Sequence, residues 1–567
     1  MPDCPENNFC TLNPLINGYS NNVTLSEGNL NADGTADEYN NTYGTFLMQS
    51  GKWYWEITCN DFNNYCMLGI AIDNAVQTTD GTPYGQTGVM AYATQGEVYN
   101  ESASSGGSYT DFLDAEVIGM AVDLDSGTPT WKFYNGNSLE GTVNLTAAQI
   151  AQGVVPFFCI GTNNKIRVNF GQDSSFAGEK TSGSAEAQDG NDIGDFYYTP
   201  PSGYLALCTS NMEEPTIGPN SDTNSNEHFD TLLYTGNNTD DTDIDGLNFK
   251  PDLIWTLTRN TSNTNNFVTD SSRGVHLDLP FTTGVESNDT DGIKAFNADG
   301  FRLGTSTNHN VTSTNYVTYN WKVNGGTTAT NDDGSADSTV QVDTTVGMSQ
   351  VLYTGNATGS GAEQTIGHGL GSVPEIIIFK SRTWSGGNWY MYNKYLDSPV
   401  ANIVELDTND VEHNDADYMN AVAPTSTVFS LGYNYTTNKN AETYIAYCFR
   451  SIEGFSKYGS YTGNVADDGT VIYCGFSPAL VIIKSADHSE SWHMWDNKRW
   501  TRDGNPNQNV LSTNTTAVET GASTPYNIDF LSNGFKIRED HDLLNGTGDK
   551  HIFMAFAKVP VKYANAI

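Results

Sequence analysis

Four aspartates near the middle of the chain have the residue type and the spacing of a calcium-binding loop. In the segment DDTDIDGLNFKPD, Asp241, Asp243, Asp245 and Gly246 follow the pattern Asp-x-Asp-x-Asp-Gly, and Asp252 stands at the twelfth position. Carboxylate oxygens grouped on a glycine turn suit the hard calcium ion. Because no flanking helices are expected, we favour an acidic turn before a strand, and we keep a structural calcium ion as the alternative.

Paired carboxylates could also hydrolyse glycosidic bonds, since that reaction needs two acids placed across a sugar. The segment VELDTND at 404–410 comes closest to the Glu-x-Asp-x-x-Glu pattern of one sandwich hydrolase family, but it lacks the final glutamate. His488 and His493 in HSESWH offer a bound metal ion as a second candidate, against the simpler interpretation of solvent-facing histidines. Neither pattern is complete, so we predict no catalytic residues and no enzymatic activity.

Tyrosines in and beside polar loops indicate a different chemistry, which is recognition by contact. Five of them lie opposite the expected core face of their strands or in Gly/Ser-rich loops: Tyr54, Tyr84, Tyr99, Tyr109 and Tyr134. Tyrosine offers a large contact area at a low cost in side-chain entropy. We predict that Tyr84, Tyr99 and Tyr109, in the loop region 83–110, bind a ligand, and an ordinary Tyr-rich surface is the alternative.

The composition predicts that β-strands position these side chains. Aromatic residues make up 11% of the 567 residues and charged residues only 16%, so Asn, Thr, Ser and Gly supply most of the polar surface. Asn, Gly and Asp suit turns, whereas Tyr, Trp, Val and Thr suit strands. Amphipathic helical runs are nearly absent, and the best short helix is NLTAAQIAQG at 144–153. The predicted fold class is therefore all-β.

The formal charge of −41, from 67 acidic and 26 basic residues, limits the partners. Such a surface repels phosphate backbones and anionic lipids, so we predict no nucleic-acid binding and no membrane insertion. The first residues, MPDCPENNFC, lack the basic and apolar regions of a signal peptide. We expect the protein to be assembled in a cytoplasm and released by lysis.

The cysteines do not form a recognisable framework. There are eight, without a CxxC pair: Cys4, Cys10, Cys59, Cys66, Cys159, Cys208, Cys448 and Cys474. Most lie in apolar strand patterns, where a thiol behaves as a small hydrophobe. Disulfides between Cys4 and Cys10 or between Cys59 and Cys66 remain open alternatives that we do not favour.

The N-terminal part has the strand pattern of a two-sheet sandwich. GKWYWEITC at 51–59 places Trp53 and Trp55 on one strand face and Tyr54 and Glu56 on the other. Further strands follow at CMLGIAID (66–73), VIGMAVDLDSGTPTWKFYNGN (117–137), VVPFFCIG (154–161) and KIRVNFGQ (165–172). Short strands with Gly, Asp and Asn turns are typical of sandwiches. The predicted core consists of Trp53, Trp55, Ile118, Met120, Val122, Trp131, Phe133 and Phe170.

These segments, in this order, resemble a SPRY domain over about residues 20–175. The resemblance implies a concanavalin-like β-sandwich that binds partners through its loops and has no enzymatic activity. The acidic tract at 178–195 departs from the pattern, and we expect it to be an exposed excursion. FYYTPPSGYLALCTSN at 196–211 then predicts a last strand on the sandwich.

The rest of the chain shows one set of landmarks three times. YTGN occurs at 234–237, 353–356 and 461–464. Each copy precedes a Pro-led apolar strand, PDLIWTLTR, PEIIIFKSR or PALVIIKSA, and each set ends in an aromatic strand, YVTYNW, YIAYCF or FMAFAK. We predict three copies of a β-rich, sandwich-like domain of about 110 residues, a usual domain size. The predicted boundaries are 1–211 for the sandwich, 212–325 for copy one, 326–342 for a linker, 343–452 for copy two and 453–567 for copy three.

A SPRY-like domain followed by YTGN-type copies is similar to structural proteins of tailed bacteriophages, especially marine ones, which are usually regarded as tail or fibre components. The resemblance implies a non-enzymatic virion protein that recognises a host surface through a glycan or a protein and contacts other virion proteins. A homo-oligomer is expected, with a trimer first, because fibres and spikes are usually symmetric. A capsid decoration protein and an extracellular carbohydrate-active enzyme are the alternatives.

Overall fold

The computed structural model divides the chain into two compact units: an N-terminal unit made of Met1–Glu214 together with Gly469–Tyr473, and a C-terminal unit made of Pro215–Asp468 and Cys474–Val561. Each unit is described by itself. The structure describes residues 7–16, 23–35, 39–60, 66–72, 88–101, 103–104, 109–151, 153–181, 187–218, 221–262, 266–359, 361, 363–500, 505–521 and 526–558.

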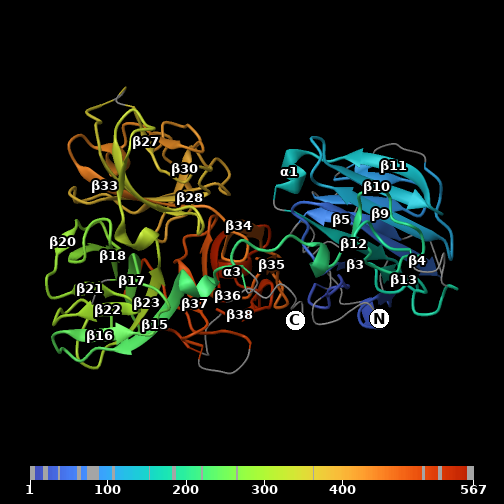
Figure 1. Cartoon of the computed structure of the whole chain (residues 1–567), viewed down its shortest axis with the longest axis horizontal. Helices are drawn as coiled ribbons and strands as arrows, with labels where there is room; N and C mark the ends of the chain where they lie inside the picture. Colours follow the sequence, from blue (N-terminus) through green and yellow to red (C-terminus); the bar gives the residue numbers. More distant parts are fainter. Residues whose placement is uncertain are drawn as a thin grey trace. The chain divides into compact units, whose positions relative to one another are not determined.

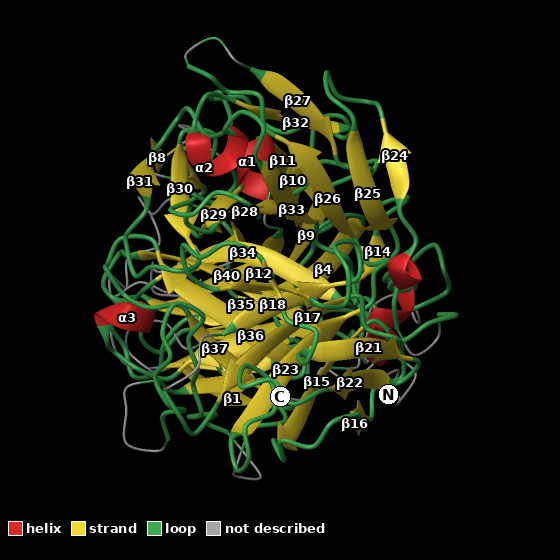
Figure 2. Ribbon diagram, turned by 90° about the vertical axis from the view of Figure 1, so that its left-hand side faces the viewer, coloured by secondary structure: helices red, strands yellow, loops and turns green. Residues whose placement is uncertain are grey.

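Strands dominate both units, which confirms the predicted all-β class, and Figure 2 shows them with a few short helices. The helices found among the described residues are α1 (Ala147–Ile150), α2 (Tyr435–Asn438) and α3 (Asp542–Asn545), with 3-10 turns at Thr209–Asn211, Ser225–Glu227 and Asn324–Gly326. The predicted helix is α1, which Thr146 begins with a capping box completed by Gln149. Within the described part of the chain, no helix is long and apolar enough to span a membrane.

The N-terminal unit is a sandwich of two sheets (Figure 1). One sheet has the order β1-β2-β13-β4-β9-β10-β11, with β14 parallel to β4. Its strands are β1 (Val23–Ser26), β2 (Asn31–Gly34), β4 (Lys52–Asn60), β9 (Val117–Asp123), β10 (Thr130–Asn135), β11 (Ser138–Asn144), β13 (Lys165–Asn169) and β14 (Leu205–Ala206). The other, ordered β3-β12-β5-β6-β7-β8, contains β3 (Asn40–Tyr43), β5 (Met67–Ile72), β6 (Val89–Ala93), β7 (Val98–Asn100), β8 (Ala103–Ser104) and β12 (Val154–Ile160).

The predicted core of this sandwich is confirmed. All eight predicted residues are buried in one hydrophobic cluster between the sheets: Trp53, Trp55, Ile118, Met120, Val122, Trp131, Phe133 and Phe170. The alternation of side chains along β4 delivers Trp53 and Trp55 to this cluster, because successive residues of a strand point to opposite faces.

The other face of β4 is not a solvent face, which corrects the expectation for Tyr54. Tyr54 is 2% exposed and packs edge-on against Phe196, with ring centroids 5.4 Å apart. Glu56 is also buried, and its carboxylate accepts hydrogen bonds from the backbone N–H groups of Tyr197 and Tyr198, both at 2.8 Å. The segment after the sandwich therefore folds back over β4, which the alternation along β4 alone could not predict.

Part of the acidic tract 178–195 also belongs to this covering layer. Asp189 is buried, and its carboxylate accepts hydrogen bonds from the N–H of Ala206 at 2.8 Å and from the side-chain amide of Asn211 at 2.7 Å. The part of the tract around Asp189 is therefore anchored beside β14, which corrects the expectation of an exposed excursion.

The C-terminal unit contains three sheet groups (Figure 1). The first group comprises β15 (Phe229–Thr235), β16 (Thr242–Asp245), β17 (Leu253–Thr258), β18 (Phe267–Asp270), β19 (Leu277–Pro280), β20 (Ser287–Asn288), β21 (Ile293–Asn297), β22 (Gly300–Leu303) and β23 (Asn315–Trp321). The second comprises β24 (Ala329–Asn331), β25 (Ser338–Asp343), β26 (Met348–Thr354), β27 (Gln364–Gly367), β28 (Ile376–Ser381), β29 (Tyr390–Asn393), β30 (Asn402–Glu405), β31 (His413–Asn414), β32 (Val428–Leu431) and β33 (Thr443–Phe449). The third comprises β34 (Ser456–Thr462), β36 (Pro478–Ser485), β37 (His493–Asp496), β38 (Ile528–Phe530), β39 (Gly534–Ile537) and β40 (Lys550–Ala557), whereas β35 (Val471–Tyr473) lies in the segment grouped with the N-terminal unit.

The main sheets of the three groups share one strand order. The central four strands run β15-β23-β17-β18 in the first group, β26-β33-β28-β29 in the second and β34-β40-β36-β37 in the third. In each group, the strand closing the group pairs antiparallel with the strand that contains the YTGN tyrosine (β15, β26 or β34) and with the Pro-led strand. Residues 326–342, which the sequence suggested as a linker, contain β24 and most of β25, and these strands extend the second main sheet.

The YTGN segments carry the same contacts in each group. The hydroxyls of Tyr234, Tyr353 and Tyr461 each donate a 2.8 Å hydrogen bond to a backbone carbonyl, on His309, Thr437 and Leu544 respectively. The N–H groups of Asn237, Asn356 and Asn464 donate to the side chains of Asn310, Asn438 and Asn545. A Cβ on Gly236, Gly355 or Gly463 would overlap a backbone carbonyl oxygen. Three of the four motif residues are therefore explained by local packing.

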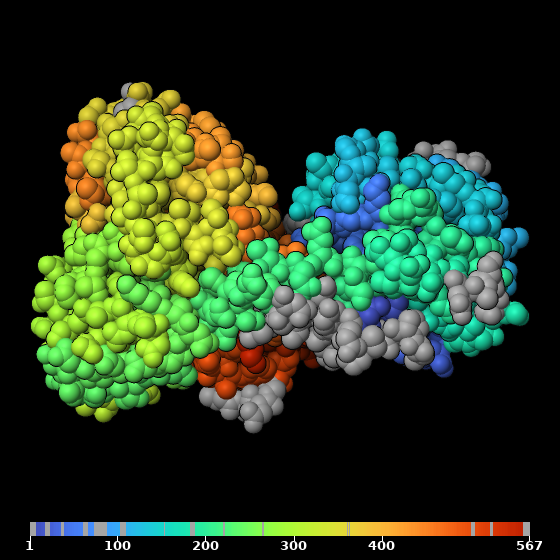
Figure 3. All heavy atoms as spheres, viewed as in Figure 1, coloured from blue at the N-terminus to red at the C-terminus, as the bar shows by residue number. Residues whose placement is uncertain are grey.

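The three groups pack in a closed cycle around one core. The indole N–H of Trp389 donates to the carbonyl of Pro280 at 2.8 Å, and that of Trp492 donates to the carbonyl of Glu405, also at 2.8 Å. The side chain of Asn266 closes the cycle by donating to the carbonyl of Thr513 at 3.2 Å. One hydrophobic cluster contains buried residues of all three groups. In Figure 3, their green, yellow and orange segments lie against one another.

Candidate binding site

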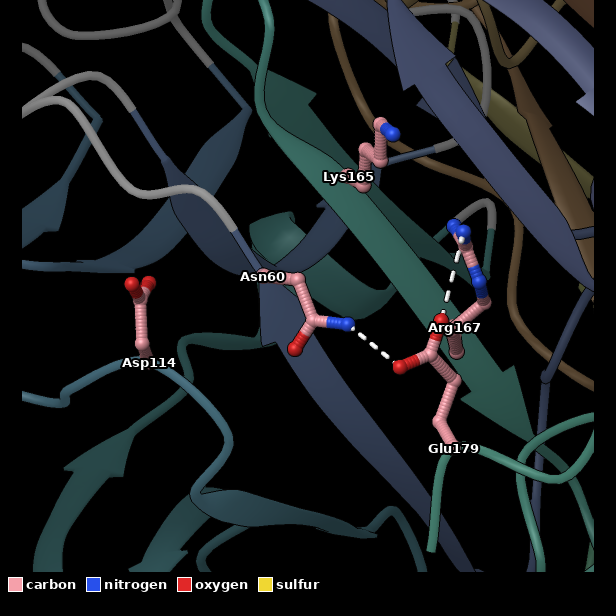
Figure 4. A pocket seen from close by; sticks show the side chains of 5 residues that line it. All are labelled: Asn60, Asp114, Lys165, Arg167 and Glu179. Atoms are coloured by element: carbon pink, nitrogen blue, oxygen red, sulfur yellow. Dashed lines mark hydrogen bonds and ion pairs between the residues drawn. The ribbon is translucent and has the colours of Figure 1, made fainter.

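A polar pocket opens on the outer face of the first sheet of the N-terminal unit. It has a volume of about 320 Å³ and is lined by Asn60, Asp114, Lys165, Arg167 and Glu179 (Figure 4). Asn60 ends β4, and its register partner Lys165 begins β13. The alternation along β13 turns Lys165 and Arg167 outward, because the side chains between and after them point into the core.

The pocket is held in shape by its own charges. The side-chain amide of Asn60 donates to Glu179 Oε2 at 2.7 Å, and Arg167 Nη2 lies 3.7 Å from Glu179 Oε1. Arg167 Nη1 also donates to Asp33 Oδ1 at 3.0 Å, and its side chain is only 12% exposed. Figure 4 shows the Glu179 carboxylate directed at Asn60 and Arg167. The site therefore presents fixed donors and acceptors of both signs, which suits a polar ligand.

The lining has the chemistry to bind a polar partner. None of the five side chains is a serine, cysteine or histidine. The carboxylates and cations can instead orient hydroxyl, amide or charged groups of a partner.

The tyrosines predicted to bind a ligand do not line this pocket. Tyr84 lies outside the described residues. Tyr99 lies on β7, and its hydroxyl donates to Glu97. Tyr109 packs edge-on against Phe133, with ring centroids 5.0 Å apart, and thus supports the sandwich core. The signal that could have found the pocket is the pair of cations at alternate positions of KIRVNFGQ.

The four aspartates of the predicted calcium loop take separate partners. Asp241 lies 2.8 Å from Lys294 Nζ, and both carboxylate oxygens of Asp243 accept hydrogen bonds from Arg302, at 2.8 and 2.9 Å. Asp245 is exposed on β16, whereas Asp252 is fully buried. The Asp252 carboxylate instead accepts hydrogen bonds from two backbone N–H groups, at 2.7 and 2.9 Å. The structure therefore does not gather these four residues into one site.

A different group in the first sheet group has metal-ligand chemistry. The ligand atoms of Asp278, Asp289 and His309 all lie within 4.8 Å of one another, and this is the group of three that the described residues contain. His309 Nε2 lies 2.8 Å from Asp278 Oδ2, and the Thr269 hydroxyl donates to Asp278 Oδ1 at 2.6 Å. The three side chains could hold a divalent cation, but the His309–Asp278 contact is already a complete buried ion pair.

The other candidate catalytic and metal residues are dispersed. Glu405 is 5% exposed on β30, whereas Asp410 is exposed. Burial raises the pKa of Asp407 to about 6, and this carboxylate accepts a hydrogen bond from the N–H of Trp389. His488 lies 2.8 Å from Asp549, while His493 is buried and stacks on Tyr526, with ring centroids 4.9 Å apart. Each of these groups has a structural partner of its own.

The described cysteines are unbridged and buried: Cys10, Cys59, Cys66, Cys159, Cys208, Cys448 and Cys474. Burial raises the pKa of Cys10 to about 12, which favours the neutral thiol. Cys4 lies outside the described residues.

A protein-family model matches the larger part of the chain. A family model described as "Domain of unknown function (DUF7483)" matches residues 224–560, more than half of the chain. The chain belongs to the DUF7483 family. The DUF7483 match covers all three sheet groups, so one family model spans the whole cycle of groups. Among curated proteins, none matches this DUF7483 protein.

The N-terminal unit of this DUF7483 protein contains a SPRY domain, matched at residues 52–173. Similar solved structures are the TRIM65 PSpry domain (15% identity, TM-score 0.24, 28% of this chain and 89% of that chain) and a human SPRY domain (15%, 0.22, 26% and 94%). The SPRY domain of human HERC1 is also similar, with 13% identity, a TM-score of 0.24, and coverage of 28% of this chain and 96% of that chain. The family match at residues 52–173 confirms the predicted SPRY domain.

Proposed function

We propose that this protein is a non-enzymatic virion structural protein, a tail fibre or spike component of a tailed bacteriophage that recognises a host surface. The observation that carries the proposal is the open polar pocket of the SPRY domain, whose lining offers hydrogen bonds and charges of both signs to a partner. SPRY domains are binding modules, and a pocket stiffened by ion pairs binds with less loss of entropy. Other virion proteins and a host glycan or protein are the proposed partners.

The proposal includes three copies of one β-rich unit in the DUF7483 region. The shared strand order and the recurrent contacts of the YTGN residues support an origin by duplication. A closed cycle of three units around one core makes a stiff body without free sheet ends between the units. Stiffness suits a part that transmits force between a particle and a cell.

Labelling of purified particles tests the proposal. Antibodies raised against the full chain should decorate the tails in electron micrographs, and the free protein should compete with particles for adsorption to host cells. The variant Arg167→Ala, which removes a cation from the pocket, should compete less well than Lys294→Ala, which removes a surface cation outside it. Particles without the chain, or competition unaffected by Arg167→Ala, would contradict the proposal.

The same experiment separates the alternatives. Labelling of heads at high copy number would favour a capsid decoration protein. Loss of viscosity of a polysaccharide incubated with the chain would favour a carbohydrate-active enzyme. The proposed homotrimer is tested by light scattering of the purified chain.

A further inference from the structure

Three aromatic side chains project from the second sheet group beside α2, which Figure 2 labels. Tyr433 and Tyr435 are 42% and 45% exposed, and Trp384 is half-buried in the loop after β28. The rings of Trp384 and Tyr435 meet edge-on, with centroids 6.4 Å apart. We call these three residues the aromatic patch.

The backbone around Asn434 holds the two tyrosines outward. Asn434 is extended, and its side chain turns inward, where Nδ2 donates to Asp415 Oδ2 at 2.5 Å and Oδ1 accepts from the N–H of Thr436 at 2.6 Å. Residues on either side of an extended residue point the opposite way. Tyr433 and Tyr435 are therefore fixed on the solvent side by a hydrogen-bonded anchor, so the rings are positioned before a ligand arrives.

A polar rim borders the rings. Lys439 Nζ lies 5.1 Å from the centroid of the Trp384 ring and 3.2 Å from Glu442 Oε1. The carboxylate of Asp417 lies near the Tyr433 hydroxyl and raises its pKa. Apolar ring faces beside carboxylates and one ammonium group can contact both the C–H face and the hydroxyls of a sugar.

The fold does not need these aromatic residues. In the first sheet group, Asn310 Nδ2 donates to the carbonyl of Gly304, as Asn438 Nδ2 does to that of Gly432. The first and third residues after the glycine are Thr305 and Thr307 in the first group, where the second group has Tyr433 and Tyr435.

The position of Trp384 is likewise occupied by a threonine in the first sheet group. Arg259 and Arg382 occupy corresponding positions. The backbone N–H of each donates to the carbonyl of the first residue of the closing strand, which is Asn315 in the first group and Thr443 in the second. Two residues after these arginines stand Thr261 and Trp384. The first sheet group thus has the same backbone contacts with threonine at all three positions. The fold therefore does not require aromatic side chains at these positions, although exposing them to water is unfavourable.

We propose that the aromatic patch binds an uncharged hexose polysaccharide, with sugar rings stacked on Tyr433 and Tyr435 and hydroxyls bonded to the rim. The formal charge of −41 and the carboxylates of the rim disfavour anionic glycans. The inference extends the proposed surface recognition to a second site in the DUF7483 region. It does not depend on placement in a virion, because the purified chain suffices to test it.

Native gels containing dextran, mannan or galactan test the proposal directly. The full chain should be retarded by at least one of these polymers, and the variant Tyr433→Thr/Tyr435→Thr should bind it about tenfold more weakly or worse. The substitutions reproduce the residues of the first group, so the thermal transition should not change. Leu139→Thr, which replaces a 54% exposed apolar side chain of the SPRY domain, is the matched control and should retain binding.

Three outcomes would overturn the proposal. The first is no retardation by any of the three polymers, and the second is retardation that the double tyrosine variant retains. The third is stronger retardation by alginate, an anionic polymer, than by the neutral ones. If Leu139→Thr abolishes binding and the patch variant does not, the sugar belongs to the SPRY domain, which leaves the proposed function intact and removes this inference.

Discussion

Tyr447 donates a 2.6 Å hydrogen bond from its hydroxyl to Oδ2 of Asp270, although 177 positions separate the two residues in the chain. The same contact joins Tyr319 to Asp496 at 2.9 Å, again 177 positions apart. Each pair links two different sheet groups. The interfaces between the groups thus contain buried polar anchors in addition to hydrophobic packing.

Both aspartates belong to buried ion-pair clusters. Asp270 pairs with Arg273, which also lies 3.0 Å from Glu286, and Arg382 of the next sheet group donates two hydrogen bonds to Glu286, at 2.9 and 2.8 Å. Burial by itself would raise the pKa of Asp270, but the charge of Arg273 outweighs it and holds that pKa below the usual 3.8. The carboxylate therefore accepts the tyrosine hydrogen bond as an anion.

Replacing Tyr447 with phenylalanine should weaken the C-terminal unit. The change removes one hydrogen bond to a buried charge, which costs about 1.5–3 kcal/mol. Tyr319→Phe should cost a similar amount, because its partner Asp496 is equally buried. The midpoint of the denaturant-induced transition measures both effects. Tyr395→Phe, whose hydroxyl bonds a carboxylate within its own sheet group, is the control for an effect on the interface.

The glycine of the YTGN motif is expected to be irreplaceable. A Cβ at Gly236 would overlap the carbonyl oxygen of Val311, which is backbone and cannot move aside. Gly236→Ala should therefore lower the free energy of unfolding by about 1–3 kcal/mol, the range for overpacked sites. Gly127→Ala, where the added carbon meets nothing within 4 Å, is the control. Equal thermal shifts for the two variants would refute the packing explanation of the motif.

The pair His309–Asp278 should make stability depend on pH in both directions. Burial by itself would lower the pKa of His309 and raise that of Asp278, but their mutual attraction outweighs it, so the pKa of His309 lies above 6.5 and that of Asp278 below 3.8. The contribution of His309 to the free energy of unfolding is fully present below pH 6.5 and is lost as the pH rises through the folded pKa. The contribution of Asp278 to the free energy of unfolding is present above pH 3.8 and is lost as the pH falls through its folded pKa.

A double variant isolates this pair. His309→Thr/Asp278→Ile copies the residues at the corresponding places of the second sheet group, Thr437 and Ile403. Replacing a buried ion pair by neutral residues is often close to neutral in stability, whereas removing one partner costs about 3–5 kcal/mol. Thermal unfolding between pH 4 and 9 should therefore show a flatter profile for the double variant. An unchanged profile would assign the pH dependence to other groups.

The sequence predicts where the strands of this protein lie better than it predicts which distant residues contact them. Alternation on β4 and the landmarks of the C-terminal part depend on local periodicity, and the structure has a strand at each of them. The spacing of the acidic segment did not show that Lys294 and Arg302, more than fifty positions later, pair with its aspartates. The pocket at Arg167 and the cluster around Arg273 combine residues that only the fold brings together. Apart from the alternate cations of KIRVNFGQ, spacing along the chain does not indicate which distant residues join these contacts.

Glu56 provides the last test, because it fastens the returning segment to the SPRY sheet. Burial raises the pKa of Glu56 to about 7, against the opposing effect of four hydrogen-bond donors, including the hydroxyl of Tyr54 and the side-chain amide of Asn169. Since the folded pKa lies above the unfolded value of 4.5, the stabilisation is complete below pH 4.5 and is lost as the pH rises through 7. The loss amounts to about 3 kcal/mol, at about 1.4 kcal/mol for each pKa unit. Glu56→Gln should flatten the pH profile of the SPRY thermal transition between pH 4.5 and 7. A Glu56→Gln profile as steep as that of the unmodified chain would show that this carboxyl does not control attachment of the segment.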